Sequence, residues 1–108
     1  MLPKPIRQTD EDFLEFLRGQ ACVTCGAPPR SDPSHLRHRG AGGSDYTACS
    51  QCRRCHDLLH SMGIITAPPF FFTRNGVVIW REQSRQLAEY FSDPAVILKK
   101  AAEIQAAA

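Results

Sequence analysis

Residues 22–60 read CVTCGAPPRSDPSHLRHRGAGGSDYTACSQCRRCHDLLH, and this stretch decides the fold. One pair of cysteines spaced C-x-x-C opens it and a second pair stands near its end, so each pair can give two thiolates to one metal ion. The loop of 26 residues between the pairs, Gly26 to Gln51, is long but can be closed by a tetrahedral ion. We therefore predict one structural zinc ion on Cys22, Cys25, Cys52 and Cys55. The alternative is a set of reduced, partly buried thiols without metal.

A fifth cysteine, Cys49, extends the second pair to a C-x-x-C-x-x-C run. It could compete for the metal, but on a strand that packs inward it is expected to be a small core residue. An odd number of cysteines does not suit a complete disulfide framework, and no signal peptide opens the chain. Thiolate-bound zinc in a reducing, cytoplasmic compartment is therefore the expected chemistry.

The 108 residues allow one domain, whose limited core would gain from a metal staple. A net charge of +2 predicts no nucleic-acid partner by itself. Between residues 30 and 54, however, five arginines stand against two aspartates, so this segment is basic and suits an anionic substrate. No apolar run approaches the length of a membrane span, so we expect no membrane partner.

Periodicity and turn residues predict the elements around this stretch. Thr9 is expected to cap a first helix that ends at Gly19, and Gly26 permits the tight turn after the first cysteine pair. The later elements are predicted as strands at 34–39 and 45–50 joined by a glycine turn, a helix at 52–62, a hairpin turning at Asn75-Gly76, a helix at 80–91 and a last helix capped by Asp93 with Pro94 at its first position.

The single domain divides into residues 1–20 (arm and first helix), 21–63 (zinc-stapled core) and 64–108 (hairpin and helices). In the last part, two helices are expected to bury apolar side chains. The inward residues of the helix at 80–91 are predicted to be Trp80, Leu87 and Phe91. The buried stripe of the last helix is predicted to consist of Ile97, Leu98, Ala101 and Ile104.

His56 and His60 are four residues apart on the predicted helix, so their side chains lie one turn apart on one face. Two histidines at this spacing can chelate one divalent cation, and open coordination positions would make that ion catalytic. The alternative is a pair of solvated helix histidines. Because the second cysteine pair fixes the start of this helix, we predict that the two histidines bind a catalytic ion such as Mg²⁺, Mn²⁺ or Ni²⁺.

His35 lies on the predicted first strand and would face the same cleft as His56 if the hairpin packs on the helix. A neutral imidazole can accept a proton from water, which hydrolysis of a phosphodiester requires of its general base. His38 is the competing candidate, but three residues further on it should point to the other face of a regular strand. For either histidine the alternative is a polar surface residue.

Four arginines are expected around this cleft, where each can bind a phosphate through two hydrogen bonds. Arginine is common on protein surfaces, so the clustering is the informative feature. We predict that nucleic-acid phosphates are bound by Arg37, Arg39, Arg53 and Arg54.

The stretch 22–63 contains, in order, a cysteine knuckle, a histidine strand, a glycine turn, a second knuckle and a Cys-His-x-x-x-His helix. In this it resembles the HNH, or ββα-metal, nuclease family. The lead-in DEDFLEFLRGQACVTCG is also similar to small phage-encoded members, including the recombination-associated Ref type. The resemblance implies an α+β fold with a small ββα-metal (His-Me finger) core and flanking N- and C-terminal helices. It further implies a bacterial or phage-encoded protein that acts on DNA, with an unidentified recombination or packaging partner.

By the same resemblance His35 is the general base, the two helix histidines hold the catalytic ion and the four knuckle cysteines hold zinc. Two positions depart from the family pattern. Ser34, a poor ligand, stands where many members have a metal-binding His or Asp directly before the base. Many members also have an Asn on the second strand that holds the base or its loop, a role that would fall here to Thr47 or Asp45.

Together these features predict a metal-dependent endonuclease that hydrolyses DNA phosphodiester bonds. The alternative is a zinc-dependent nucleic-acid-binding module that does not cleave, and Ser34 is the residue that motivates it. A third interpretation is a zinc-stapled protein-interaction domain whose surface is carried by the helices from Trp80 to Ala108.

Overall fold

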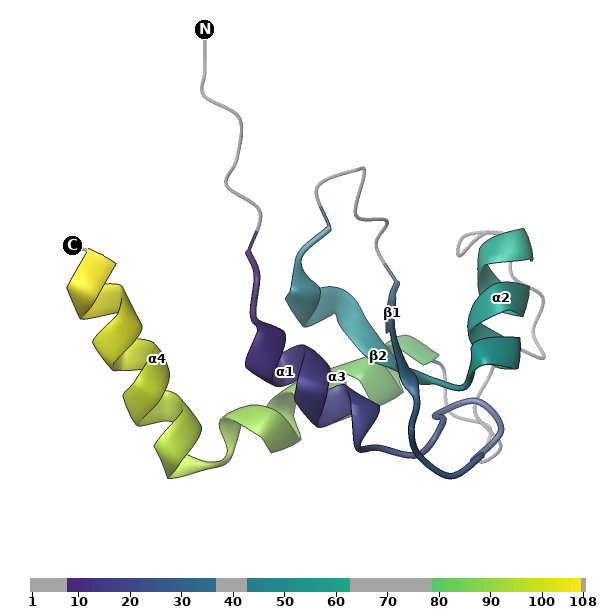
Figure 1. Cartoon of the computed structure of the whole chain (residues 1–108), viewed down its shortest axis with the longest axis horizontal. Helices are drawn as coiled ribbons and strands as arrows, with labels where there is room; N and C mark the ends of the chain where they lie inside the picture. Colours follow the sequence, from purple (N-terminus) through teal and green to yellow (C-terminus); the bar gives the residue numbers. More distant parts are fainter. Residues whose placement is uncertain (1–7, 37–42, 63–78, 108) are drawn as a thin grey trace, which may run out of the picture.

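The computed structural model describes residues 8–36, 43–62 and 79–107 of the chain. Within these ranges the fold is α+β, as predicted, with four α-helices and a small two-stranded antiparallel sheet (Figure 1). In chain order the elements are α1 (Glu11–Arg18), β1 (Asp32–His35), the 3-10 turn η2 (Asp45–Thr47), β2 (Ala48–Gln51), α2 (Arg53–Met62), α3 (Ile79–Phe91) and α4 (Pro94–Ala107). The predictions for the N-terminal arm, Arg37, His38, Arg39, the glycines at 40 and 42 and the hairpin at Asn75-Gly76 lie outside the described residues.

Helix α1 is capped one residue later than predicted. Asp10, rather than Thr9, is the N-cap, and its Oδ1 accepts the backbone N–H of Phe13 at 3.1 Å. A carboxylate at this position accepts a hydrogen bond from an otherwise unpaired N–H, and its negative charge interacts favourably with the positive end of the helix dipole. The buried face of α1 consists of Phe13, Leu14 and Leu17.

The two strands pair antiparallel, with Asp32 opposite Gln51 and His35 opposite Ala48. Strand β1 begins before the predicted strand, whereas β2 begins only at Ala48 because the preceding residues form η2. Ser44 causes this turn, since its Oγ accepts the N–H of Tyr46 at 3.0 Å and so competes with strand pairing. As a result, Asp45 is held in a turn beside the end of β1.

The sheet separates two apolar clusters, because neighbouring strand residues point to opposite faces. The first cluster contains Cys49 with Val23, Leu36, Leu59 and Ile79. The second contains Ala48 with Phe13, Leu14, Leu17 and Tyr90. The prediction that Cys49 is a small core residue is therefore confirmed, and burial raises the pKa of its thiol.

Two glutamines of α3 cover the outer edge of β2. Gln83 Nε2 donates to the carbonyl oxygens of Tyr46 and Ala48, the second at 3.3 Å. Gln86 Oε1 accepts the N–H of Ser50 at 3.1 Å, and Gln86 Nε2 donates to Ser50 Oγ at 2.6 Å. A two-stranded sheet leaves backbone groups unpaired along its edges, and these amide side chains satisfy them.

This role of the glutamines corrects the predicted orientation of α3. Trp80, predicted to point inward, is 41% exposed. Leu87 and Phe91 are partly buried and pack against the second cluster. The fully buried face is instead formed by Ile79, Gln83, Gln86 and Tyr90.

Helix α4 begins as predicted, with Asp93 Oδ1 accepting the N–H of Ala95 at 2.9 Å. Its predicted buried stripe is wrong, because the side of α4 that faces α1 carries the lysines that pair with Asp12 and Asp10. The exposed residues include the whole predicted stripe: Ile97, Leu98, Ala101 and Ile104. Figure 1 shows α4 projecting away from the sheet. Across the described ranges, no helix combines the length and apolar character needed to cross a membrane.

Candidate functional site

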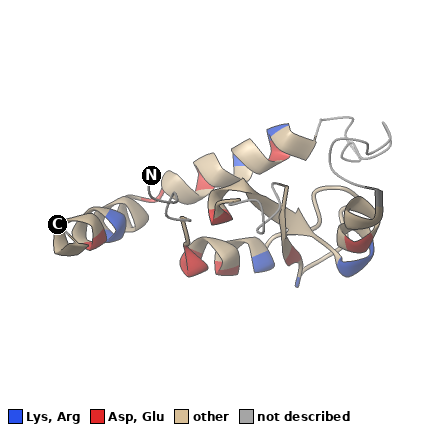
Figure 2. Ribbon diagram, turned by 90° about the horizontal axis from the view of Figure 1, so that it is seen from above, with Lys and Arg blue, Asp and Glu red and all other residues tan. Residues whose placement is uncertain are grey.

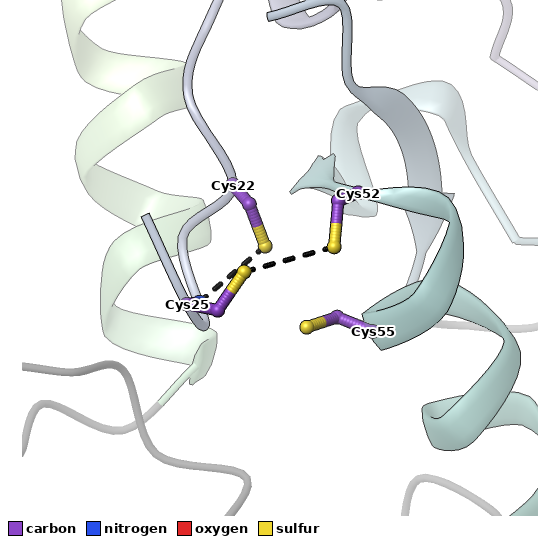
Figure 3. Close-up of side chains that lie close together, drawn as sticks. All are labelled: Cys22, Cys25, Cys52 and Cys55. Carbon is purple, nitrogen blue, oxygen red and sulfur yellow. Dashed lines mark hydrogen bonds between the residues drawn. The ribbon is translucent and has the colours of Figure 1, made fainter. Parts of the chain in front are cut away.

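Four cysteines from two separate segments meet at one end of the sheet (Figure 3). Their sulfur atoms all lie within 4.8 Å of one another, and Cys25 Sγ is 3.7 Å from Cys52 Sγ. Sulfur ligands at the corners of a zinc tetrahedron are separated by about 3.8 Å, given a Zn–S bond of about 2.3 Å. The four cysteines could therefore hold a zinc ion with little rearrangement, in agreement with the predicted ligand set.

Local backbone geometry shapes the first cysteine pair. Gly26 has φ 78°, a left-handed conformation that favours glycine, and its N–H donates to the carbonyl oxygen of Cys22 at 2.9 Å. The N–H of Cys22 donates to the Ala27 carbonyl at 2.9 Å and the N–H of Val23 to the Ser50 carbonyl at 2.9 Å. The predicted role of Gly26 is confirmed, and the knuckle is tied to the outer edge of β2.

The donor set is that of a closed structural site, with four sulfur ligands and no position left for substrate. Burial alone would raise the pKa of the Cys22 thiol, but hydrogen bonds from the backbone of Cys25, Cys52 and Thr24 lower it to about 7. Burial raises the pKa of the Cys55 thiol. Zinc binding at neutral pH must therefore displace protons from the cluster.

We expect the zinc affinity to fall as the pH is lowered from about 8 to about 6, because protons then compete with the metal for thiolates. The direction of this pH dependence follows from the pKa of the Cys22 thiol. Above a pKa of about 7 its thiolate is ready to bind, and below that value zinc must displace a proton. Titration against a chromophoric chelator at several pH values measures the effect. A constant affinity across this range would contradict thiolate ligation.

The two histidines of α2 lie side by side, with ring centroids 4.6 Å apart. His56 is half-buried and its Nδ1 is 3.2 Å from Asp32 Oδ2, whereas His60 is exposed. Two adjacent imidazoles are a donor set that suits Ni²⁺, while Mg²⁺ and Mn²⁺ prefer oxygen ligands. Among the described residues, the ligand atoms of three or more His, Cys, Asp or Glu side chains converge at the cysteine cluster and not at the two histidines. An ion bound by the histidines would therefore have open coordination positions.

His35 is buried and paired with a buried carboxylate. Its Nε2 is 2.9 Å from Asp45 Oδ1. A carboxylate can only accept a hydrogen bond, so Nε2 carries the hydrogen, and in the neutral ring Nδ1 is the nitrogen that can accept a proton. Of the two residues proposed to hold the base, Asp45 contacts it, whereas the Thr47 hydroxyl donates to the Ser44 carbonyl at 2.7 Å.

The Asp45 carboxylate is itself held by Asp10, a residue whose part in the site the sequence did not indicate. Asp45 Oδ2 accepts the backbone N–H of Asp10 at 2.9 Å. The buried Asp10 carboxylate also accepts hydrogen bonds from Tyr46 Oη at 2.8 Å and Lys100 Nζ at 3.0 Å. Burial, with the Asp10 charge, raises the pKa of Tyr90 to about 12. This network links the start of α1, η2 and α4 around the partner of His35.

Strand geometry gives His35 and His56 different neighbours. Asp32 and His35 are three residues apart on β1, so in a regular strand they point to opposite faces. Asp32 contacts His56, and His35 contacts Asp45. That His35 and His56 act on one phosphate therefore stays a prediction. Ser34 is fully buried and makes no hydrogen bond through its Oγ within the described residues, so in this conformation it offers no ligand at the surface.

Of the predicted phosphate-binding arginines, Arg53 and Arg54 lie exposed at the start of α2. Arg53 Nη1 is 3.3 Å from Asp32 Oδ2, and its Nε is 3.3 Å from Asp57 Oδ1. Exposed pairs of this kind contribute little to stability, so Arg53 can exchange them for a phosphate. Figure 2 shows acidic and basic residues interspersed along the helices, with a basic segment at the start of α2 on the right.

One segment of this chain is similar to a curated protein, the uncharacterized protein YdfU of Escherichia coli (strain K12). The two are 35% identical over 65 residues, which cover 56% of this chain and 18% of YdfU. The chain thus spans less than a fifth of this relative's length. No family model matches the chain, and no solved structure matches it significantly.

Proposed function

We propose that the protein is a metal-dependent endonuclease that hydrolyses DNA phosphodiester bonds. The observation that carries this proposal is the buried pair of His35, on β1, and Asp45, in η2. Strand β1 also packs against α2, the helix that carries two adjacent imidazoles. The cysteine cluster joins this helix to the knuckle, which agrees with the order of features in the nuclease family that the sequence resembles. The four cysteines have a structural role in this proposal and take no part in cleavage.

His35 is the general base. Asp45 accepts the Nε2–H of its ring and holds its orientation, so Nδ1 can take a proton from the attacking water. The carboxylate also stabilises the imidazolium that forms when the proton is transferred. The backbone N–H of Asp10 keeps the carboxylate in place by occupying its second oxygen.

His56 and His60 are the protein ligands of the second ion. A divalent cation bound there would supply positive charge at the scissile phosphate and at the leaving 3′ oxygen. Because imidazole suits Ni²⁺ better than Mg²⁺, we expect Ni²⁺ to bind this pair most tightly of the three candidate ions. Arg53 and Arg54 would hold neighbouring phosphates, so binding to DNA should weaken as salt is raised.

Nicking of supercoiled plasmid with added Ni²⁺, Mn²⁺ or Mg²⁺ tests the proposal. His56→Ala should keep the fold and the structural zinc but lose nicking and the second ion, because His56 is not one of the four sulfur ligands. Zinc content, Ni²⁺ titration and the nicking rate measure these three properties. Ser61→Ala, at an exposed position on the same helix, is the matched control and should behave as wild type. Loss of the structural zinc from His56→Ala would contradict this division of ligands.

The second candidate function is a nucleic-acid-binding zinc module that does not cleave. Two observations favour it. Ser34 is buried, and His35 and Asp32 lie on opposite faces of β1. Salt-dependent DNA binding without nicking in any of the three ions would select this function over the endonuclease.

A further inference from the structure

We propose that Asp32 is the positioning residue of the α2 histidine pair. Its carboxylate accepts the Nδ1–H of His56 and leaves Nε2 to bind a divalent cation shared with His60. This inference rests on the proposed function only in taking the two histidines as metal ligands.

Both partners of this contact are fixed by backbone structure. Asp32 begins β1 and pairs with Gln51, the last residue of β2. His56 lies in the first turn of α2, where its N–H donates to the Cys52 carbonyl at 2.9 Å. Because Gln51 and Cys52 are consecutive, the 3.2 Å separation between Asp32 Oδ2 and His56 Nδ1 is set by the junction of β2 and α2.

The chemistry of the contact selects one form of the ring. A carboxylate only accepts, so in the neutral ring His56 Nδ1 carries the hydrogen and Nε2 keeps its lone pair. This tautomer is the less common one in free histidine, so the carboxylate changes which nitrogen can bind metal. Histidine ligands generally donate their other ring N–H to such a partner, which orients the ring and raises its basicity.

Asp32 contacts the His56 ring nitrogen that does not bind the metal, so Asp32 is not itself a metal ligand. Within the described ranges, Asp32, His56 and His60 are not among the groups whose ligand atoms converge on one point. Arg53 Nη1 also lies 3.3 Å from the same Oδ2, but this exposed contact can be exchanged for a phosphate. The proposal therefore rests on the contact between Asp32 and His56.

The test uses zinc-loaded protein with Ni²⁺ as the probe. Asp32→Ala should weaken Ni²⁺ binding, measured by calorimetry, by roughly 10- to 100-fold. In nitrogen-15 NMR of the Ni²⁺-free protein, His56 should lose its Nδ1–H tautomer. Zinc content and circular dichroism should match wild type. Asp57→Asn is the matched control, because it also removes one negative charge beside Arg53 but leaves the contact to His56.

Unchanged Ni²⁺ affinity in Asp32→Ala would overturn the inference, and so would equal weakening in Asp32→Ala and Asp57→Asn, which would indicate a net-charge effect. If Asp32→Ala does not fold, Asp32→Asn decides: its amide can donate to Nδ1 as well as accept from it, so the Nδ1–H tautomer is no longer enforced and Ni²⁺ binding should weaken. Unchanged Ni²⁺ affinity in a folded Asp32→Asn would contradict the proposal.

The two proposals fail separately. A wild-type protein that never nicks DNA, yet binds Ni²⁺ in an Asp32-dependent way, would remove the nuclease and keep the role of Asp32. A protein that nicks DNA, with Ni²⁺ affinity unchanged by Asp32→Ala, would do the reverse.

Discussion

Cys22→Ala is expected to lose both the zinc ion and the cooperative fold. The cluster joins the knuckle after α1 to the junction between β2 and α2, and the sheet it supports has only two strands in the described part of the chain. Structural zinc binds small peptides with apparent free energies of about 10 to 16 kcal/mol. A whole domain is stable by about 5 to 15 kcal/mol, so loss of the ion removes as much stability as the fold possesses.

Elemental analysis and thermal unfolding followed by circular dichroism measure this effect. Wild type should carry one zinc ion per chain when it is purified without chelator. Cys49→Ala is the matched control, since Cys49 is equally a buried cysteine but packs in the first apolar cluster. It should keep the zinc and lose only about 1 kcal/mol of stability. A folded Cys22→Ala protein, or wild type without zinc, would show that the cluster is not a metal staple.

The sequence predicted the features that depend on local chemistry. The C-x-x-C spacing needs only a turn, and Gly26 supplies the left-handed residue that this turn requires. The start of α4 was equally readable, because Asp93 and Pro94 are local signals for a helix N-terminus. Helix α2 was predicted at 52–62 from the apolar Leu58 and Leu59, and the structure has it at Arg53–Met62.

Features that depend on distant contacts could not be predicted in this way. Gln83 and Gln86 are buried because β2 has an open edge, which no pattern within α3 reveals. The N–H of Asp10 reaches Asp45, 35 residues away in sequence. The apolar stripe of α4 has the periodicity of a buried face, but the ion pair between Lys100 and Asp10, at the start of α1, places the stripe on the outer side of the helix. In each of these regions, pairing of polar groups outweighs apolar periodicity.

His35→Ala is expected to reduce DNA nicking by roughly 10²- to 10⁴-fold, the effect typical of removing a general base. The zinc content should be unchanged, because His35 is not a ligand of the cluster. DNA affinity should also persist, since it is assigned to the arginines of α2. Nicking rates with Ni²⁺, zinc content and DNA binding at several salt concentrations separate these three properties.

The controls for this prediction come from the neighbours of His35. Asp45→Asn should also lower the nicking rate, but by less than His35→Ala, because an amide can still contact Nε2 while lacking the charge that stabilises the imidazolium. His38→Ala tests the competing candidate and should leave the rate unchanged. If His35→Ala nicks plasmid at the wild-type rate and His38→Ala does not, the base is His38. If neither substitution changes the nicking rate, the pair of His35 and Asp45 is a buried structural contact and the base lies elsewhere. If, in addition, none of the three ions supports nicking by the wild-type protein, the non-cleaving module is the better account of the site.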